Sequence, residues 1–547
     1  MATNRNQANA VFHFLRWDRT ADKIEFEFKY DRPPMFHGFP LQPPNIKRIT
    51  VKRDKHYILH GKLFGQGYYS EVHSFMQWLR ELLEQIQSGT LRKSQLIKFK
   101  SHSYDYSISG HFFTKLWSPE FVVKADKIED SFLRYKLAFA INFLEAHHRT
   151  EYVSDGDKEP VPPLNTTFVE WCANAPTRGI AYSLRSTKVH TCMERMTETS
   201  EHVRKSAQTS NSTSFDHFMF QFHDFNIEVQ FIENIDNISF SQKLAIKYYS
   251  RTGNSPTILQ RNVVVEFLSF VFGRHILPVG SSLFEKIASA PDFDQIVSFR
   301  GQNPWGDDLV IVSRTMSYPP IEFSPFLAES ESESEPPHLD SPAFTIESFI
   351  EKFLPRYEEE RSKSRLVDLL WGIWTAQPQS DDQRLPIYAS ALESVAKAYL
   401  KANAITLEYI SSTEATILRQ EVLKCVDEFL GKLDLSESAK RGIKNGLSNI
   451  NQYSANERMK KFQEAIGLEL FDREKAAIRR RNASAHGDRS VLTEVSDEKQ
   501  QQASMAEYVY RTLLHRVFLR ILGYEGRYID YGTVGFPERL MTDKSDD

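Results

Sequence analysis

A short acidic segment divides this sequence into two parts with different hydrophobic patterns. The segment PFLAESESESEPPHLDSP, at residues 325–342, alternates serine with glutamate and contains several prolines. It offers little apolar surface to bury, which is typical of a solvated linker. We therefore predict a multidomain chain with an N-terminal region at 1–325, an acidic linker at 326–343 and a C-terminal domain at 344–547.

The N-terminal region shows the pattern of β-strands. Four segments alternate apolar with polar side chains, as half-buried strands do, at 23–30, 48–54, 56–64 and 225–234. Helical spacing of apolar residues is found at 70–87 and 257–272. We interpret the glycine-containing run HGKLFGQGYYSEV, at 60–72, as a turn between strands. Strands interspersed with a few helices predict a β-rich α+β region.

The C-terminal domain shows the spacing of amphipathic helices. Its two clearest apolar stripes are Tyr388, Leu392, Val395 and Tyr399, and then Leu418, Val422, Cys425, Phe429 and Leu433. Ser454 and Glu457 form a capping-box pattern at the start of another helix. A last long helix, at about 499–522, is expected to end at Gly523. The pattern predicts an all-α bundle of five or more helices over about 344–525.

Composition narrows the classes of function. The 547 residues carry a formal net charge of -4, so any contact with nucleic acid must be local, because a general basic surface needs clustered cations. The three cysteines, Cys172, Cys192 and Cys425, are too scattered for a disulfide framework or a zinc site. No apolar run approaches the ~20 residues that span a bilayer. We expect a cytoplasmic protein with no membrane segment, no metal and no cofactor.

One segment of the C-terminal domain carries candidate catalytic residues. The run AAIRRRNASAHGDRS, at 476–490, contains Arg481, Asn482 and His486. Histidine can transfer protons near neutral pH, and the planar arginine fork stays charged and meets phosphate oxygens. On a helix, Asn482 and His486 share a face, whereas Arg481 is offset from His486 by about 140°. That offset favours a composite cleft made by two copies of the motif.

The run from Arg481 to Gly487 resembles the R-N-x-x-x-H signature of HEPN ribonucleases. The order of a β-rich region and a helical domain, with the stretch LQRNVVVEFLSFVFGRHILPVG at 259–280, is similar to ApeA-like anti-phage proteins. The resemblance implies an all-α HEPN bundle in the C-terminal domain, with Arg481 and His486 as catalytic residues and Asn482 orienting the site. It also implies a metal-independent endoribonuclease that works as a homodimer or higher oligomer and leaves a 2′,3′-cyclic phosphate.

The same resemblance implies a biological role. ApeA-like proteins act in phage defence by abortive infection, so cellular RNA is the expected substrate and tRNA its leading candidate. The N-terminal region would sense a phage-derived trigger or restrain the nuclease. A non-catalytic HEPN scaffold that binds RNA or a partner protein is the alternative. The intact pair of Arg481 and His486 favours the enzyme, because a pure binding module does not need a histidine there.

Further residues near the motif or in the bundle have two interpretations each. Arg479 and Arg480 either bind RNA phosphates beside Arg481 or are simply solvated. Glu393 lies where HEPN domains often carry a polar residue that faces the active site, but an exposed helix charge is the simpler interpretation. We expect Arg511 and His515, one turn apart on the last helix, to form a surface pair and not a second site.

Overall fold

The computed structural model divides into two compact units. Unit 1 comprises Met1–Pro319 and Phe323–Leu354, and unit 2 comprises Pro320–Glu322 and Pro355–Asp547. The structure describes residues 25–28, 30–32, 34–37, 46–53, 59–68, 77, 80–81, 84, 95–101, 104–112, 120–122, 132–148, 165–175, 217–232, 242–250, 252–286, 294–300, 317–323, 344–377, 379, 381–406, 408–433, 435–447, 451, 453–485 and 497–543. The acidic segment at 326–343 lies outside the described residues.

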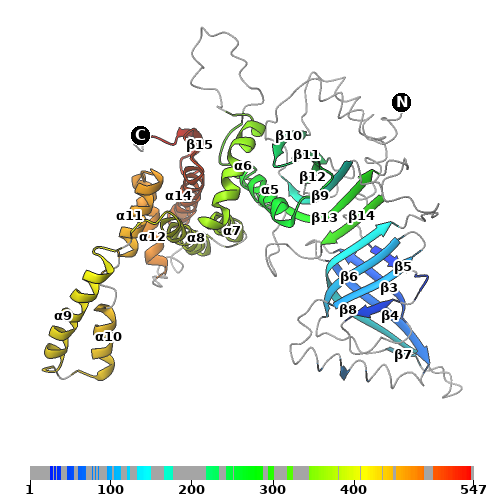
Figure 1. The fold of residues 1–547 in the computed structure, drawn as a ribbon, viewed down its shortest axis with the longest axis horizontal. Helices are drawn as coiled ribbons and strands as arrows, with labels where there is room; N and C mark the ends of the chain where they lie inside the picture. The colour runs from blue at the N-terminus through cyan, green and yellow to red at the C-terminus, as the bar shows by residue number, and fades with distance from the viewer. Residues whose placement is uncertain are drawn as a thin grey trace, which may run out of the picture. The chain divides into compact units, whose positions relative to one another are not determined.

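Unit 1 is built on a 14-stranded antiparallel sheet (Figure 1). Its strands are β1 (Glu25–Phe28), β2 (Met35–His37), β3 (Ile46–Arg53), β4 (Leu59–Tyr68), β5 (Gln95–Ser101), β6 (Tyr104–Phe112), β7 (Glu120–Val122), β8 (Phe132–His148), β9 (Asn165–Ala175), β10 (His217–Phe222), β11 (Phe225–Ile232), β12 (Gln242–Ser250), β13 (Leu277–Lys286) and β14 (Asp294–Arg300). Its main path runs β1-β3-β4-β8-β14-β13-β9-β12-β11-β10. The predicted β-rich N-terminal region is thus confirmed.

Strand alternation correctly identified β3 as half-buried, since Ile49 and Val51 are fully buried and Lys52 is exposed. The half-buried strand expected at 225–234 is wrong, because in β11 Glu228 is fully buried between Ile227 and Val229. The predicted turn at 60–72 is wrong over its first part, because β4 continues to Tyr68 and pairs with β3 and β8. Glycines suggested a turn, but neighbouring strands on both sides satisfy the β4 backbone and keep it extended.

One well-defined helix, α5 (Ile258–Val271), lies in unit 1 and confirms the helix expected at 257–272. Thr257 caps it: its hydroxyl accepts from the Gln260 backbone, and the Gln260 side chain reaches back to the Thr257 N–H. Gly273 follows the helix with φ +60°, and a Cβ there would overlap the Tyr318 carbonyl carbon at 1.9 Å. That position therefore requires glycine. Of the helix expected at 70–87, residues 77, 80, 81 and 84 are described, and they are helical.

Unit 2 is helical, as the sequence predicts. Its helices are the C-terminal part of α6 (Ile346–Lys363), then α7 (Leu366–Ala376), α8 (Asp381–Ala402), α9 (Ser412–Leu430), α10 (Glu437–Leu447), α11 (Ala455–Ile466), α12 (Asp472–Ala485) and α14 (Asp497–Ile521). A small two-stranded sheet, β15 (Arg527–Ile529) with β16 (Glu538–Leu540), follows. Within the described part of the chain, no helix is long and apolar enough to span a membrane.

The core of unit 2 lies between α7, α8, α11, α12 and α14. Tyr388, Leu392 and Val395 of α8 are buried, which confirms the first apolar stripe. Two local predictions are also confirmed. Ser454 and Glu457 form the capping box of α11. Gly523 follows α14 in a left-handed conformation, with φ +73°.

Candidate functional site

The candidate motif lies in the C-terminal half of α12. The backbone of Arg479, Arg480, Arg481 and Asn482 is helical, and this is all that the structure describes of these four residues. His486 lies outside the described residues. The geometry between the three predicted catalytic side chains therefore remains a prediction.

Helical periodicity relates the motif to the buried face of α12. Glu474 and Ala477 are buried, and α12 packs against α14 and α8. At 100° per residue, position 481 falls within about 20° of position 474, whereas position 482 is about 80° away. Position 481 is thus on the same face of α12 as the buried Glu474, which is the face that packs against the bundle. Position 482 is at the side of that face.

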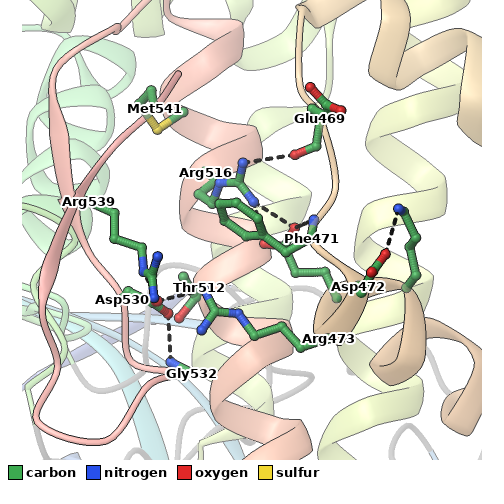
Figure 2. Close-up of polar contacts among 12 residues, drawn as sticks. Glu469, Phe471, Asp472, Arg473, Thr512, Arg516, Asp530, Gly532, Arg539 and Met541 are labelled. Atoms are coloured by element: carbon green, nitrogen blue, oxygen red, sulfur yellow. Dashed lines mark hydrogen bonds and ion pairs between the residues drawn. The ribbon is translucent and has the colours of Figure 1, made fainter. Parts of the chain in front are cut away.

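A buried ion pair fixes the first turn of α12 to α14. Both carboxylate oxygens of Glu474 lie 2.6 Å from Nη1 of Arg516, and both side chains are almost fully buried. Nη2 of Arg516 donates to the carbonyl of Glu469 at 2.9 Å, as Figure 2 shows. The guanidinium also lies over the Phe471 ring, 4.2 Å from its centroid. Removing one partner from such a pair leaves an uncompensated buried charge.

Glu474 also caps the helix that it anchors. Its Oε2 accepts from the backbone N–H of Phe471, the N-cap residue, at 2.9 Å. Burial raises the pKa of the Glu474 carboxyl, and the charge and hydrogen bonds of Arg516 oppose that rise. One side chain therefore satisfies a helix-end donor and holds α12 against α14.

A second anchor is centred on the buried carboxylate of Asp530, just after β15. Arg473 of α12 and Arg539 of β16 approach it from two sides, at 2.6 and 2.8 Å (Figure 2). The Thr533 hydroxyl donates to the same carboxylate at 2.7 Å, and the Gly532 N–H does so at 3.0 Å. These bonds tie the start of α12 to the β15–β16 hairpin. Sequence reasoning missed both anchors.

Arg511 and His515 do not form the predicted surface pair, because both side chains are buried in the bundle. Arg511 donates to Glu507, and the Tyr388 hydroxyl donates to the same carboxylate at 2.8 Å. This pairing offsets part of the cost of removing the arginine from water. Burial, with a smaller contribution from Arg511, lowers the pKa of His515 to about 3. His515 is therefore neutral near pH 7 and is not an acid of the kind expected of His486.

Glu393 is exposed on α8. This agrees with the simpler interpretation of the sequence, an exposed helix charge, and the relation of Glu393 to the motif stays a prediction. Among the described residues, no group of three or more histidine, cysteine, aspartate or glutamate side chains is placed to hold a metal ion.

The chain was compared with models of protein families, with curated proteins and with solved structures, and none of them matches it. The geometry of unit 2 must therefore be interpreted from its own residues. It provides a helix with a rigidly attached first turn and a basic second half. A rigidly attached helix of this kind is the element on which a cation can be held at a fixed place beside a phosphate.

Proposed function

We propose that this protein is a metal-independent endoribonuclease of the HEPN type that acts on cellular RNA as a homodimer or higher oligomer. The observation that carries the proposal is the location of Arg481 and Asn482 on α12, a helix fixed at its start by Glu474 and Arg516. Catalysis by positioning needs functional groups held on rigid elements, and this anchoring supplies that condition. The resemblance of the motif to the HEPN signature supplies the chemistry.

In the proposed reaction, the ribose 2′-oxygen attacks the adjacent phosphorus and the bond from phosphorus to the 5′-oxygen breaks. The products are a 2′,3′-cyclic phosphate and a 5′-hydroxyl, with one proton moved from the 2′-oxygen to the leaving oxygen. His486 transfers protons and Arg481 stabilises the charge that develops on the phosphate. Asn482 orients the site, and Arg479 and Arg480 extend the phosphate-binding surface. We assign no catalytic role to Glu393.

The proposed biological role is phage defence by abortive infection, with tRNA as the first substrate to test. Unit 1 would then receive a phage-derived trigger or restrain the nuclease. A cell that expresses such a protein must keep it inactive until infection. Overexpression of the wild-type chain should therefore arrest growth, and His486→Ala should relieve the arrest.

The decisive experiment incubates purified protein with total tRNA in EDTA. Wild type should give discrete fragments that end in a cyclic phosphate, and Arg481→Ala and His486→Ala should give none. Lys475→Ala is the matched control: it removes one positive charge from an exposed position of α12, where the lysine forms an ion pair with the still more exposed Asp472. It should cleave like wild type.

Three other outcomes of this assay would contradict the proposal or favour its alternative. Cleavage that EDTA abolishes would contradict the metal-independent mechanism. Cleavage that survives both motif substitutions would place the active site outside the motif. RNA binding without cleavage, in wild type and variants alike and with no effect on growth, would favour the non-catalytic HEPN scaffold.

A further inference from the structure

The helices α9 and α10 form a hairpin whose apolar residues are largely uncovered. The main tertiary contact of each helix is with the other, and Figure 1 draws the pair in yellow. Among the described side chains of α9, Leu430 is the buried one. Exposed large apolar side chains of the hairpin and its connection are Ile417, Leu418, Phe429, Leu433, Leu435 and Ile443.

Four residues of α9, three of them exposed and Val422 half-buried, follow the spacing of a coiled-coil seam. Leu418, Val422, Cys425 and Phe429 are separated by four, three and four positions, which is a repeat of 3.5 residues. Leu418 is 44% exposed, Phe429 is 62% exposed and Cys425 is also exposed. A repeat of this kind is the pattern by which one helix packs along another.

A hairpin with so little buried surface is poorly stabilised alone. Isolated helices shorter than about 12–15 residues, such as the 11-residue α10, are marginal in water, and helices in proteins are stabilised mainly by burial of an apolar face. Both helices are nevertheless well formed: α9 has a complete capping box from Ser411 and Glu414. The apolar seam is therefore the natural place for a covering partner.

The charges of the two helices favour a second copy of the hairpin as the covering partner. The helix α9 carries four acidic and two basic side chains, whereas α10 carries three basic and one acidic. Two hairpins can meet about a twofold axis with α9 of one copy along α10 of the other, and this arrangement brings opposite charges together on both sides of the apolar seam. The surface carries both signs of charge in equal measure, so it offers no excess of positive charge to attract RNA or an anionic membrane.

We propose that the α9–α10 hairpin is a self-association surface that binds the hairpin of a second copy of this chain. The inference deepens the proposed function, because it names a surface for the homodimer proposed there, and it rests on that part of the proposal alone. A face ~28 Å long and about two helix diameters wide offers roughly 560 Å², which is small beside the ~800 Å² that a standard interface buries on each partner. The association is therefore reversible on dilution.

The test measures molecular mass by light scattering over a dilution series of the full chain, without RNA. Wild type should move between dimer and monomer. The double variant Leu418→Glu with Phe429→Glu should dimerise at least about 30-fold more weakly, because it places charges in the seam. Val534→Glu is the control, since Val534 is a large apolar residue of unit 2 that is 83% exposed and lies outside the hairpin. It should dimerise like wild type.

A cross-linking measurement tests the same surface without disturbing the seam. In a Cys192→Ser background, a bismaleimide with a spacer of about 20 Å, two helix diameters, should join two chains through the exposed Cys425, whereas Cys172 is buried. Cys425→Ser should abolish the cross-linked dimer. A wild-type monomer at every concentration, a dimer that the double variant leaves intact, or a dimer without the Cys425 cross-link would each overturn the proposal. None of these results depends on RNA cleavage.

Discussion

The helices α8 and α9 both carry apolar residues at steps of three and four, yet they lie in opposite surroundings. In α8, Tyr388, Leu392 and Val395 are buried against α7, α11, α12 and α14. In α9, Leu418 and Phe429 are exposed, and the main contact of the helix is with α10. An apolar stripe indicates which face of a helix will be covered, but other segments decide what covers it. In α8 the covering segments belong to the same chain, and in α9 we propose that they belong to a second chain.

Breaking an ion pair should give the largest difference in lost stability between the core of unit 2 and the α9–α10 hairpin. Glu474→Ala leaves Arg516 buried and unpaired, so we expect the free energy of unfolding of unit 2 to fall by about 3–5 kcal/mol. Glu437→Ala removes an 85% exposed partner of Lys440 at the start of α10, and a loss under about 1 kcal/mol is expected. Urea denaturation followed by circular dichroism checks both. Equal small losses would mean that the anchor of α12 contributes little to stability.

Truncating an apolar residue should cost much more stability in the stripe of α8 than in the stripe of α9. Leu392→Ala creates a cavity in the core and should cost about 2–5 kcal/mol. Leu418→Ala, measured at a protein concentration where the chain is monomeric, should cost under about 0.5 kcal/mol. At higher concentration the cost of Leu418→Ala should grow, because the dimer then contributes to stability. A cost that does not change with concentration would separate α9 from self-association.

How far the sequence predicts this molecule depends on how local the signal is. The capping box of Ser454, the C-terminal glycine of α14 and the alternation in β3 are set by residues within a few positions, and each was predicted correctly. The burial of Arg511 was not, because Tyr388, one of its partners, is 123 positions away. The glycines within β4 gave a local signal for a turn, and pairing with a distant strand overrode it.

In the candidate site, too, the features with a local sequence signal were predicted and those that depend on long-range contacts were missed. Arg481, Asn482 and His486 were found from a short motif, since their spacing and residue types suffice to suggest the chemistry. The anchors of α12 were missed, because Glu474 and Arg516 are 42 positions apart and Arg473 and Asp530 are 57 apart. The acidic first turn of α12 was the one available signal, and most helices share it.

Acid should unfold the core before it affects the hairpin. His515 is neutral in the folded core with its pKa lowered to about 3, whereas an unfolded histidine titrates near 6.5. The unfolded state therefore binds more protons between these values. The contribution of His515 to the free energy of unfolding is fully present above about pH 6.5. It falls as the pH drops, by about 2 kcal/mol at pH 5.

The matched measurement compares the slope of stability against pH in wild type and His515→Gln. The slope should be smaller in the variant, whatever the absolute stability. The hairpin segment at 412–447 contains no histidine, so its self-association should be unchanged between pH 7 and pH 6. Identical slopes would show that His515 titrates normally in the folded protein.

The smallest expected effects come from two matching helix caps, Ser454 of α11 and Ser411 of α9. Each hydroxyl accepts from the backbone N–H three residues later, so either change to alanine should cost about 1 kcal/mol locally. Phe462 of α11 is buried against α8, so Ser454→Ala should lower protection from hydrogen exchange across α8 and α14. Ser411→Ala should lower protection within α9 and α10 and leave α14 unchanged. Loss of protection in α14 from Ser411→Ala would mean that the hairpin and the core unfold as one unit, and α9 would then differ from α8 in its exposure but not in its cooperativity.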